Sequence, residues 1–400
     1  MPPGRRHLII GAIGIAQILS WGSTYYLLAI LARPMAADTG WPFAWIIGGV
    51  SLGLLAAGLA ALRVGRAIER LGGRPVLATS AGLIAAGLAL LAMSPGIPFY
   101  LLGWIVLGAG MAAGLYDAAF STLGRIFGAT ARGAITSLTL WGGFASTVCW
   151  PISAFLVETL GWRGTCAVYA AVQLGVVLPL YLFLLPREET RDGSARSSIA
   201  SAASTGEVPS DRRSVAFAIL AAMMTISGMV SALLSVHIIA MLQAGGLALA
   251  AAVATGALIG PAQVGARVVE MMAGGRHHPI WTLAASVGLS SVGIVLLWLG
   301  FPVPALALIA YGAGNGLWSI ARGTVPLSLF GSAGYAVLMG KLATPSLIAQ
   351  AAAPSIGAVL LVGIGAEGTL AVLAALALAN IADAVVLRLW SLPRGAPASG

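Results

Sequence analysis

The feature that most constrains this chain is a series of long apolar runs. Runs of roughly 20 or more residues recur along all 400 residues, and a helix of that length crosses a hydrocarbon core of about 30 Å. Only 8% of the residues are charged and 59% are hydrophobic, which leaves too few polar groups to cover a surface that faces water. The sequence therefore predicts an all-α integral membrane protein.

We predict twelve transmembrane helices. Their approximate spans are 8–33, 42–64, 75–94, 98–124, 133–157, 163–185, 214–242, 247–269, 280–299, 303–325, 334–362 and 367–389. A polar, Ser/Ala-rich segment without periodicity separates the sixth span from the seventh and predicts a flexible linker. The predicted domains are thus an N-terminal six-helix bundle (1–186), a cytoplasmic linker (187–213), a C-terminal six-helix bundle (214–390) and a cytoplasmic tail (391–400).

The two predicted bundles share a Gly-Gly-Arg sequence after their second helix, at residues 72–74 and 274–276. This repeat predicts two pseudo-symmetric halves, an arrangement typical of transporters that bind substrate near the bilayer midplane. With a cytoplasmic N-terminus, eighteen arginines lie at cytoplasmic loops, termini or helix ends, whereas only Arg33 and Arg163 lie outside. This bias predicts cytoplasmic N- and C-termini, and we expect a multi-pass protein of a bacterial inner (cytoplasmic) membrane.

The sequence GRAIERLGGR, residues 65–74, concentrates charge between the second and third spans. Gly65 permits close helix approach, Glu69 can pair with a nearby arginine, and Arg70 and Arg74 face the cytoplasm. These residues, with Gly72, match the G-x-x-x-(D/E)-R-x-G-x-R signature, so the chain resembles the major facilitator superfamily. The resemblance implies the fold of that superfamily and secondary transport by alternating access. It also implies a gating role for the motif residues Gly65, Glu69, Arg70, Gly72 and Arg74. The alternative is that the positive charges of the motif only hold this loop on the cytoplasmic side.

Three further stretches resemble the monocarboxylate porter and oxalate/formate antiporter branch of that superfamily. They are DTGWPFAWIIGG after span one, GAGMAAGLYDAAFSTLGRIF in span four and LGWRGTCAVYAA at span six. Span one lacks the lysine of proton-lactate symporters, and span five lacks the glycine-proline pattern of proton-driven drug antiporters. The branch implies a small mono- or dicarboxylate as the substrate.

Cations inside predicted spans are the main candidates for substrate binding, because a charge there needs a partner or a water-filled cavity. Arg267 follows Gln263 by one turn in span eight, and Lys341, the only lysine, lies in span eleven. Both cations resemble the residues that bind carboxylates in oxalate/formate antiporters. The alternatives are an Arg267 salt bridge to Glu270 on the same helix face, and snorkelling of Lys341 to the cytoplasmic surface.

Other candidates are polar or aromatic residues in the spans. Tyr311 and Asn315 begin a polar stripe on span ten that continues to Ser319 and Arg322, and Trp21, Tyr25 and Tyr26 of span one either line a cavity or pack. Asp117 in span four either carries a coupling proton or pairs with Arg70 or another gating arginine.

We expect a secondary transporter of a small organic anion, with the lipid bilayer and a small-molecule substrate as partners and a coupling proton or an exchanged anion. The alternative is efflux of an uncharged or cationic toxicant, such as a drug or a trivalent metalloid bound by Cys149 and Cys166, although both cysteines are also typical small core residues. The four histidines show no motif spacing to acids, so we expect no enzyme, no metal and no cofactor. We also expect a monomer without a nucleic-acid partner.

Overall fold

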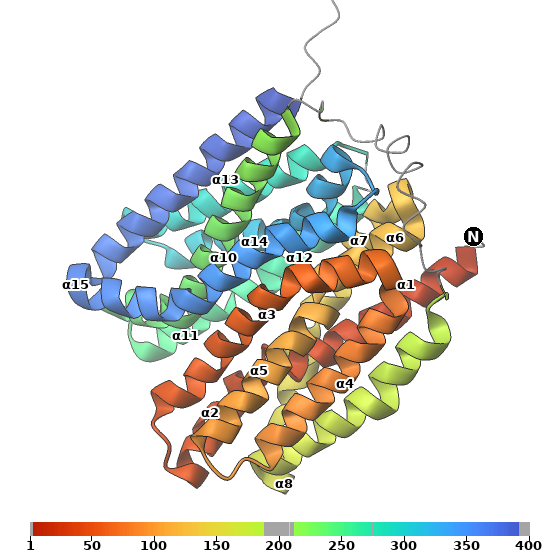
Figure 1. Ribbon diagram of the computed structural model, residues 1–400. Helices are drawn as coiled ribbons and strands as arrows, with labels where there is room; N and C mark the ends of the chain where they lie inside the picture. The colour runs from red at the N-terminus through yellow and green to blue at the C-terminus, as the bar shows by residue number, and fades with distance from the viewer. Residues whose placement is uncertain (1–2, 188–207, 209–211, 274–275, 392–400) are drawn as a thin grey trace, which may run out of the picture. The chain divides into compact units, whose positions relative to one another are not determined.

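The computed structural model describes residues 3–187, 208, 212–273 and 276–391, and the regular structure in these ranges is helical (Figure 1). Most of the predicted linker (187–213), nearly all of the predicted tail (391–400) and the pair Gly274–Gly275 lie outside the described residues. The chain divides into two compact units. Unit 1 comprises Met1–Phe127, Ala134–Asp192 and Ala336–Ala352, and unit 2 comprises Gly128–Gly133, Gly193–Tyr335 and Ala353–Gly400.

Most helices of unit 1 come from the first half of the chain. They are α1 (Pro3–Gly22), α2 (Leu27–Thr39), α3 (Phe43–Leu71), α4 (Gly73–Ala92), α5 (Ile97–Gly114), α6 (Tyr116–Phe127), α7 (Ala131–Gly143), α8 (Ala145–Val172) and the π-helical turns η2 (Gln173–Val177) and η3 (Leu180–Leu184). The helix α4 packs along α5, and α8 packs against α1, α2 and α4. A short 3₁₀ turn, η1 (Gly128–Thr130), and the first three residues of α7 belong to unit 2.

Unit 2 is formed mainly by the helices of the second half. They are α10 (Arg213–Ala244), α11 (Leu249–Ala257), α12 (Ile259–Met272), α13 (Pro279–Trp298), α14 (Pro304–Phe330) and the greater part of α15 (Tyr335–Ser391). The helix α14 packs along both α13 and α12. The beginning of α15, up to Ala352, belongs to unit 1 instead.

Nine helical stretches of the described chain are long and apolar enough to cross a membrane. Two of them contain two spans each, because the helix turns at Gly161 in Ala131–Leu184 and at Gly365 in Tyr335–Trp390. Both glycines have positive φ, 69° and 71°, which favours glycine over any other residue. The remaining span is α14, whose polar stripe lowers its hydropathy. These findings confirm the predicted twelve-helix membrane fold.

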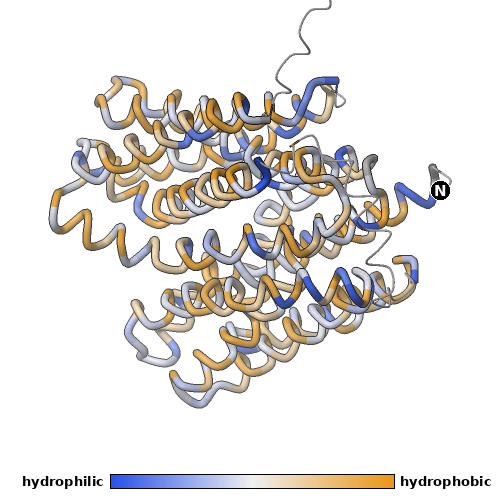
Figure 2. Tube along the Cα trace, turned by 45° about the horizontal axis from the view of Figure 1, so that its top comes forward, coloured by the Kyte–Doolittle hydropathy of each residue, from blue (hydrophilic) through white to orange (hydrophobic). Residues whose placement is uncertain are grey.

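Large apolar side chains lie both in the interior and on the surface of the units. Tyr100 and Trp104 are fully buried in the core of unit 1, whereas Phe183 is 81% and Val362 91% exposed. In Figure 2 the helices are mostly white to orange, and the bluest stretches lie mainly near helix ends and turns. Such a distribution suits helices whose outer faces contact lipid.

At least four spans that were predicted as continuous helices are broken in the described chain. Residues 23–26 separate α1 from α2, Leu115 separates α5 from α6, Phe144 separates α7 from α8, and Leu258 separates α11 from α12. Side chains satisfy backbone groups near these breaks: Thr24 Oγ1 donates to the carbonyl oxygen of Ser20 at 2.6 Å. Broken helices inside a membrane occur where backbone is buried in protein or lines a cavity, so these points position candidate sites.

Candidate functional site

An aromatic cluster lies at the break between α1 and α2 in unit 1. The ring centroid of Trp21 lies 5.5 Å from Tyr25, 5.9 Å from Tyr26 and 5.1 Å from Tyr116 of α6. Tyr26 also meets Trp150 of α8 edge-on at 6.2 Å. Tyr116 is buried, Trp150 is 42% exposed, and the three residues of span one are half-buried. The predicted aromatic residues therefore belong to one surface that is suited to flat apolar or cationic groups.

Buried amides hold this break in place. Gln17 Nε2 donates to the carbonyl oxygen of Gly114 at the end of α5 at 2.6 Å, and its Oε1 accepts from the Trp21 indole at 3.1 Å. Gln173 of η2 donates to Ser23 Oγ at 3.0 Å. Both glutamines are fully buried. Sequence reasoning missed them, although an amide inside an apolar run is itself a signal, because it needs a partner there.

Glycines bring α3 and the beginning of α15 into close contact within unit 1. A Cβ atom on Gly65 would lie 2.3 Å from the carbonyl oxygen of Ala336, and one on Gly340 would lie 2.6 Å from that of Ala61. Neither position has room for a side chain without backbone movement. The close approach that we predicted for Gly65 is thus present, and α15 is the helix that approaches.

The remaining residues of the GRAIERLGGR motif lie at the end of α3. Glu69 lies 4.0 Å from Nη1 of Arg125 on α6, and the same nitrogen donates to the Glu69 backbone carbonyl. Gly72 has φ of 87° and ends the helix. Arg70 is exposed and Arg74 is half-buried. The arginine that pairs with Glu69 therefore comes from α6, and the gating role of the motif stays a prediction.

Asp117 follows directly after the break between α5 and α6. Its side chain is half-buried, and its backbone carbonyl accepts from Ser121 Oγ at 2.6 Å. The break places an acidic residue in the first turn of α6, where the helix dipole favours a negative charge. Its coupling role and its pairing with a gating arginine both stay predictions.

Lys341 lies in the part of α15 that belongs to unit 1. The residue is exposed, and it shares its helix face with the exposed residues Ile348 and Ala352. Within the described chain Lys341 makes no hydrogen bond or ion pair. Arg267 belongs to unit 2, so the two predicted cations are carried by different units.

Arg267 and Gln263 lie on the face of α12 that packs against α14. Arg267 is 6% exposed, and its Nε donates to the carbonyl oxygen of Gly316 at 3.4 Å. A Cβ atom on Gly316 would lie 2.4 Å from the carbonyl oxygen of Gln263, and one on Gly312 would lie 2.7 Å from that of Ile259. The glycines of α14 therefore allow α12 to bury its guanidinium in an apolar bundle.

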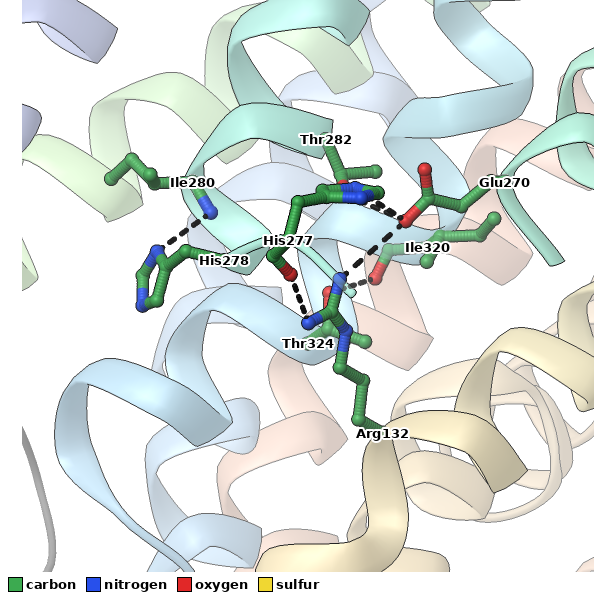
Figure 3. A network of polar contacts seen from close by, with 8 residues as sticks. All are labelled: Arg132, Glu270, His277, His278, Ile280, Thr282, Ile320 and Thr324. Atoms are coloured by element: carbon green, nitrogen blue, oxygen red, sulfur yellow. Dashed lines mark hydrogen bonds and ion pairs between the residues drawn. The ribbon is translucent and has the colours of Figure 1, made fainter. Parts of the chain in front are cut away.

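A polar network surrounds Glu270 at the end of α12 (Figure 3). Its Oε1 accepts from Thr282 Oγ1 at 2.7 Å and lies 3.2 Å from His277 Nε2 and 3.7 Å from Arg132 Nη2. Arg132 also donates to the backbone carbonyl of His277. Glu270 thus pairs with Arg132 and lies close to the His277 imidazole, and the Arg267–Glu270 bridge stays an alternative prediction. Sequence reasoning missed this network because its members are distant along the chain.

The polar stripe of α14 divides between two environments. Tyr311 and Asn315 line a cavity of about 30 Å³ within unit 2, together with residues of α10, α13 and α15. Ser319 donates instead to the carbonyl oxygen of Gly316 at 2.7 Å. The cavity also contains Asn380, which sequence reasoning did not single out.

The two cysteines are buried and free. Cys149 Sγ approaches the carbonyl oxygen of Ile18 at 3.5 Å, and Cys166 is 0% exposed. Both thiols therefore behave as small core residues in this structure, which does not favour their use as metalloid ligands.

Comparisons with known proteins agree with this architecture. The model of the Major Facilitator Superfamily matches residues 13–339, and no curated protein matches the sequence. The structure is similar to that of the human organic anion transporter MFSD10 (TETRAN), with 16% identity, TM-score 0.71, and coverage of 96% of this chain and 100% of that chain. It is also similar to the proton:xylose symporter XylE, with 12% identity, TM-score 0.75, and coverage of 98% of this chain and 97% of that chain. A third similar structure is FucP in the outward conformation, with 14% identity, TM-score 0.74, and coverage of 96% of this chain and 99% of that chain. At these identities the likeness shows the fold alone.

Proposed function

Since the chain belongs to the major facilitator superfamily and is a multi-pass membrane transporter, we propose that it moves a small organic anion, a mono- or dicarboxylate, by alternating access. The observation that carries this proposal is the burial of Arg267 in a transmembrane helix. The nearest carboxylate along that helix, Glu270, is already engaged by Arg132 and His277.

A buried cation of this kind favours an anionic ligand. Opposite charges about 4 Å apart attract by roughly 4 kcal/mol at an effective dielectric of 20, which offsets part of the cost of holding a guanidinium in a span. Arginine also binds carboxylates through two parallel hydrogen bonds. The residues proposed to contact the substrate are Arg267, Lys341, Gln263, Tyr311, Asn315, Trp21, Tyr25 and Tyr26.

The other proposed roles concern the transport cycle. The motif between α3 and α4 is proposed to gate it, and the contact of Gly65 with α15 and the pair Glu69–Arg125 support this role. Asp117, which is half-buried beside a helix break, is the candidate for a coupling proton. One structurally similar protein is a human organic anion transporter and another is a proton:xylose symporter. The similar structures therefore do not indicate which substrate class this chain transports.

Uptake of labelled oxalate, formate and lactate into proteoliposomes tests the proposal. Loss of a buried charge pair costs about 2 kcal/mol or more, so Arg267→Gln should lower kcat/KM for anion uptake more than tenfold. Arg267→Lys keeps the charge and should retain part of the rate. Arg63→Gln, which changes an exposed arginine of α3, is the matched control and should transport normally.

Two results would contradict the proposal at different points. Absence of uptake of every anion by the wild-type protein would reject the substrate class. Anion uptake that is unchanged in Arg267→Gln would keep the substrate class but remove Arg267 from the binding site. Lys341→Ala tests the second cation by the same assay.

Efflux of a flat uncharged or cationic compound is the second candidate, and the aromatic cluster of unit 1 favours it. Tyr26 and Trp150 present half-exposed rings at a helix break, where they would stack on such a compound. Trp150→Ala should then abolish resistance to a planar cationic dye, whereas Trp298→Ala, which removes a similarly exposed indole in unit 2, should not. Retained resistance in Trp150→Ala would exclude this cluster as the binding site.

A further inference from the structure

A cavity of unit 2 lies between four helices, and seven of its twelve lining residues carry a side-chain oxygen. Its lining includes Ser227 of α10, Ser290 of α13, Asn315 of α14 and Asn380 of α15. The cavity volume is about 30 Å³, and a single water needs about 10–15 Å³. The space therefore suits one or two water molecules or one small ion.

Asn380 supplies an acceptor that has no partner. Its Nδ2 donates to Ser227 Oγ at 2.9 Å, whereas its Oδ1 is buried without a hydrogen bond in the described chain. The residue as a whole is 5% exposed. An unsatisfied carbonyl at this depth costs about 1–3 kcal/mol unless a ligand occupies the cavity.

Two serines of the lining add further acceptors, because their hydroxyl hydrogens are already used. Ser286 donates to the carbonyl oxygen of Gly314 and Ser291 to that of Ala377, each at 2.9 Å. Their lone pairs remain available. The hydroxyl group of Ser290 makes no hydrogen bond within the described chain. The cavity is thus rich in acceptors, and it matches a ligand that donates hydrogen bonds or carries positive charge.

A carboxylate lies one helical turn from the unsatisfied amide. Asp383 follows Asn380 by three residues on α15, a rise of about 4.5 Å. It is half-buried and makes no hydrogen bond or ion pair in the described part of the chain. An acid in a span needs a partner, and its negative charge lowers the free energy of a cation in the adjacent cavity.

We propose that this cavity binds a monovalent alkali cation, Na⁺, through the amide oxygen of Asn380 and the neighbouring serine hydroxyl oxygens. Oxygen ligands are those that hard cations prefer. A single carboxylate balances one positive charge, so the site is matched to a monovalent rather than a divalent ion. Water would satisfy the amide, but it would not compensate the negative charge of Asp383, which lies one turn beyond the lining residue Asn380. The site is separate from Arg267 and does not depend on the anion proposed as substrate.

Equilibrium binding of ²²Na⁺ to the detergent-purified full-length chain tests the proposal, with choline chloride holding the ionic strength constant. The melting temperature should also rise with Na⁺ concentration, because an ion that binds the folded state stabilises it. Ser290→Ala and Asp383→Asn should each raise the apparent Kd for Na⁺ at least tenfold. Ser290 has no hydrogen bond to lose and Asp383→Asn keeps its shape, so both variants should fold.

Two controls match these variants. Ser328→Ala removes a hydroxyl of α14 that bonds to the carbonyl of Val325 outside the cavity, and Glu367→Gln neutralises an exposed carboxylate on α15. Both should keep the Kd within twofold of the wild type. The proposal would be overturned by absence of saturable Na⁺ binding, by a preference for K⁺, or by an equal Kd in all variants. Water would then be the occupant of the cavity. Anion uptake is not measured, so this result is independent of the proposed function.

Discussion

Glu270 is a buried carboxylate on which a hydroxyl, an imidazole and a guanidinium converge, and its substitution is therefore informative. Removing one partner of a buried ion pair lowers the free energy of unfolding by about 3–5 kcal/mol. Because Arg132 and His277 are partly exposed, we expect the loss on substituting Glu270 to lie near or below the lower end of that range. We expect Glu270→Gln to lower the melting temperature of the purified protein by several degrees. The measurement is a thermal unfolding curve in detergent.

The control for this prediction is Glu158→Gln, which neutralises an exposed carboxylate of α8. Surface charges contribute about 0–1 kcal/mol, so its melting temperature should stay close to that of the wild type. If Glu270→Gln were as stable as this control, the network of Figure 3 would not stabilise unit 2.

Helical spacing was sufficient to place Arg267 and Glu270 on one face, yet it did not find the partners of Glu270. Those partners are Arg132, which lies 138 positions earlier, and His277 beyond the end of α12. An i to i+3 rule reports only neighbours on one helix. Contacts between helices depend on packing, which the pattern of a single sequence does not specify. For the same reason the sequence did not indicate that Gln173 and Asn380 are buried polar residues with partners on other helices.

The contact of α3 with the beginning of α15 rests on glycines, so one methyl group should perturb it. In Gly65→Ala the new Cβ would lie 2.3 Å from the carbonyl oxygen of Ala336, and overpacking of this kind costs about 1–3 kcal/mol. We expect a lower melting temperature than in Gly82→Ala. A Cβ atom added to Gly82 of α4 would have no atom within 4 Å, so alanine there should be neutral or stabilising. Equal stability of the two variants would contradict the close contact.

The helices themselves were predictable because lipid imposes a length and an apolar composition on each span. The turns at Gly161 and Gly365 fall between predicted spans 133–157 and 163–185, and between 334–362 and 367–389. The breaks after Gly22 and Gly114 were not predicted. Hydropathy reports how apolar a stretch is, and it does not report whether its backbone hydrogen bonds continue.

At the scale of the whole molecule, the family and the twelve-helix fold followed from the motif at Gly65–Arg74 and from the number of spans, and the family match over residues 13–339 confirms both. The substrate branch did not follow in the same way, because the fold is shared by neighbours that carry different substrates. The compact units contain segments from both parts of the chain, since 128–133 belongs to unit 2 and 336–352 to unit 1, and the predicted domain bounds stay predictions. Such an exchange depends on contacts between helices far apart in sequence.

The orientation of the molecule in the membrane is open to a direct test, because both native thiols are buried and should not react with a maleimide. Positive residues favour the cytoplasmic side, which predicts that the turn near Glu367 faces outward and that Arg276 faces the cytoplasm. Both positions are exposed. A membrane-impermeant maleimide should therefore label Glu367→Cys in intact cells and Arg276→Cys only after permeabilisation, with the unsubstituted protein unlabelled in both cases. The reverse pattern would invert the topology and would place the gating motif of α3 on the outer face.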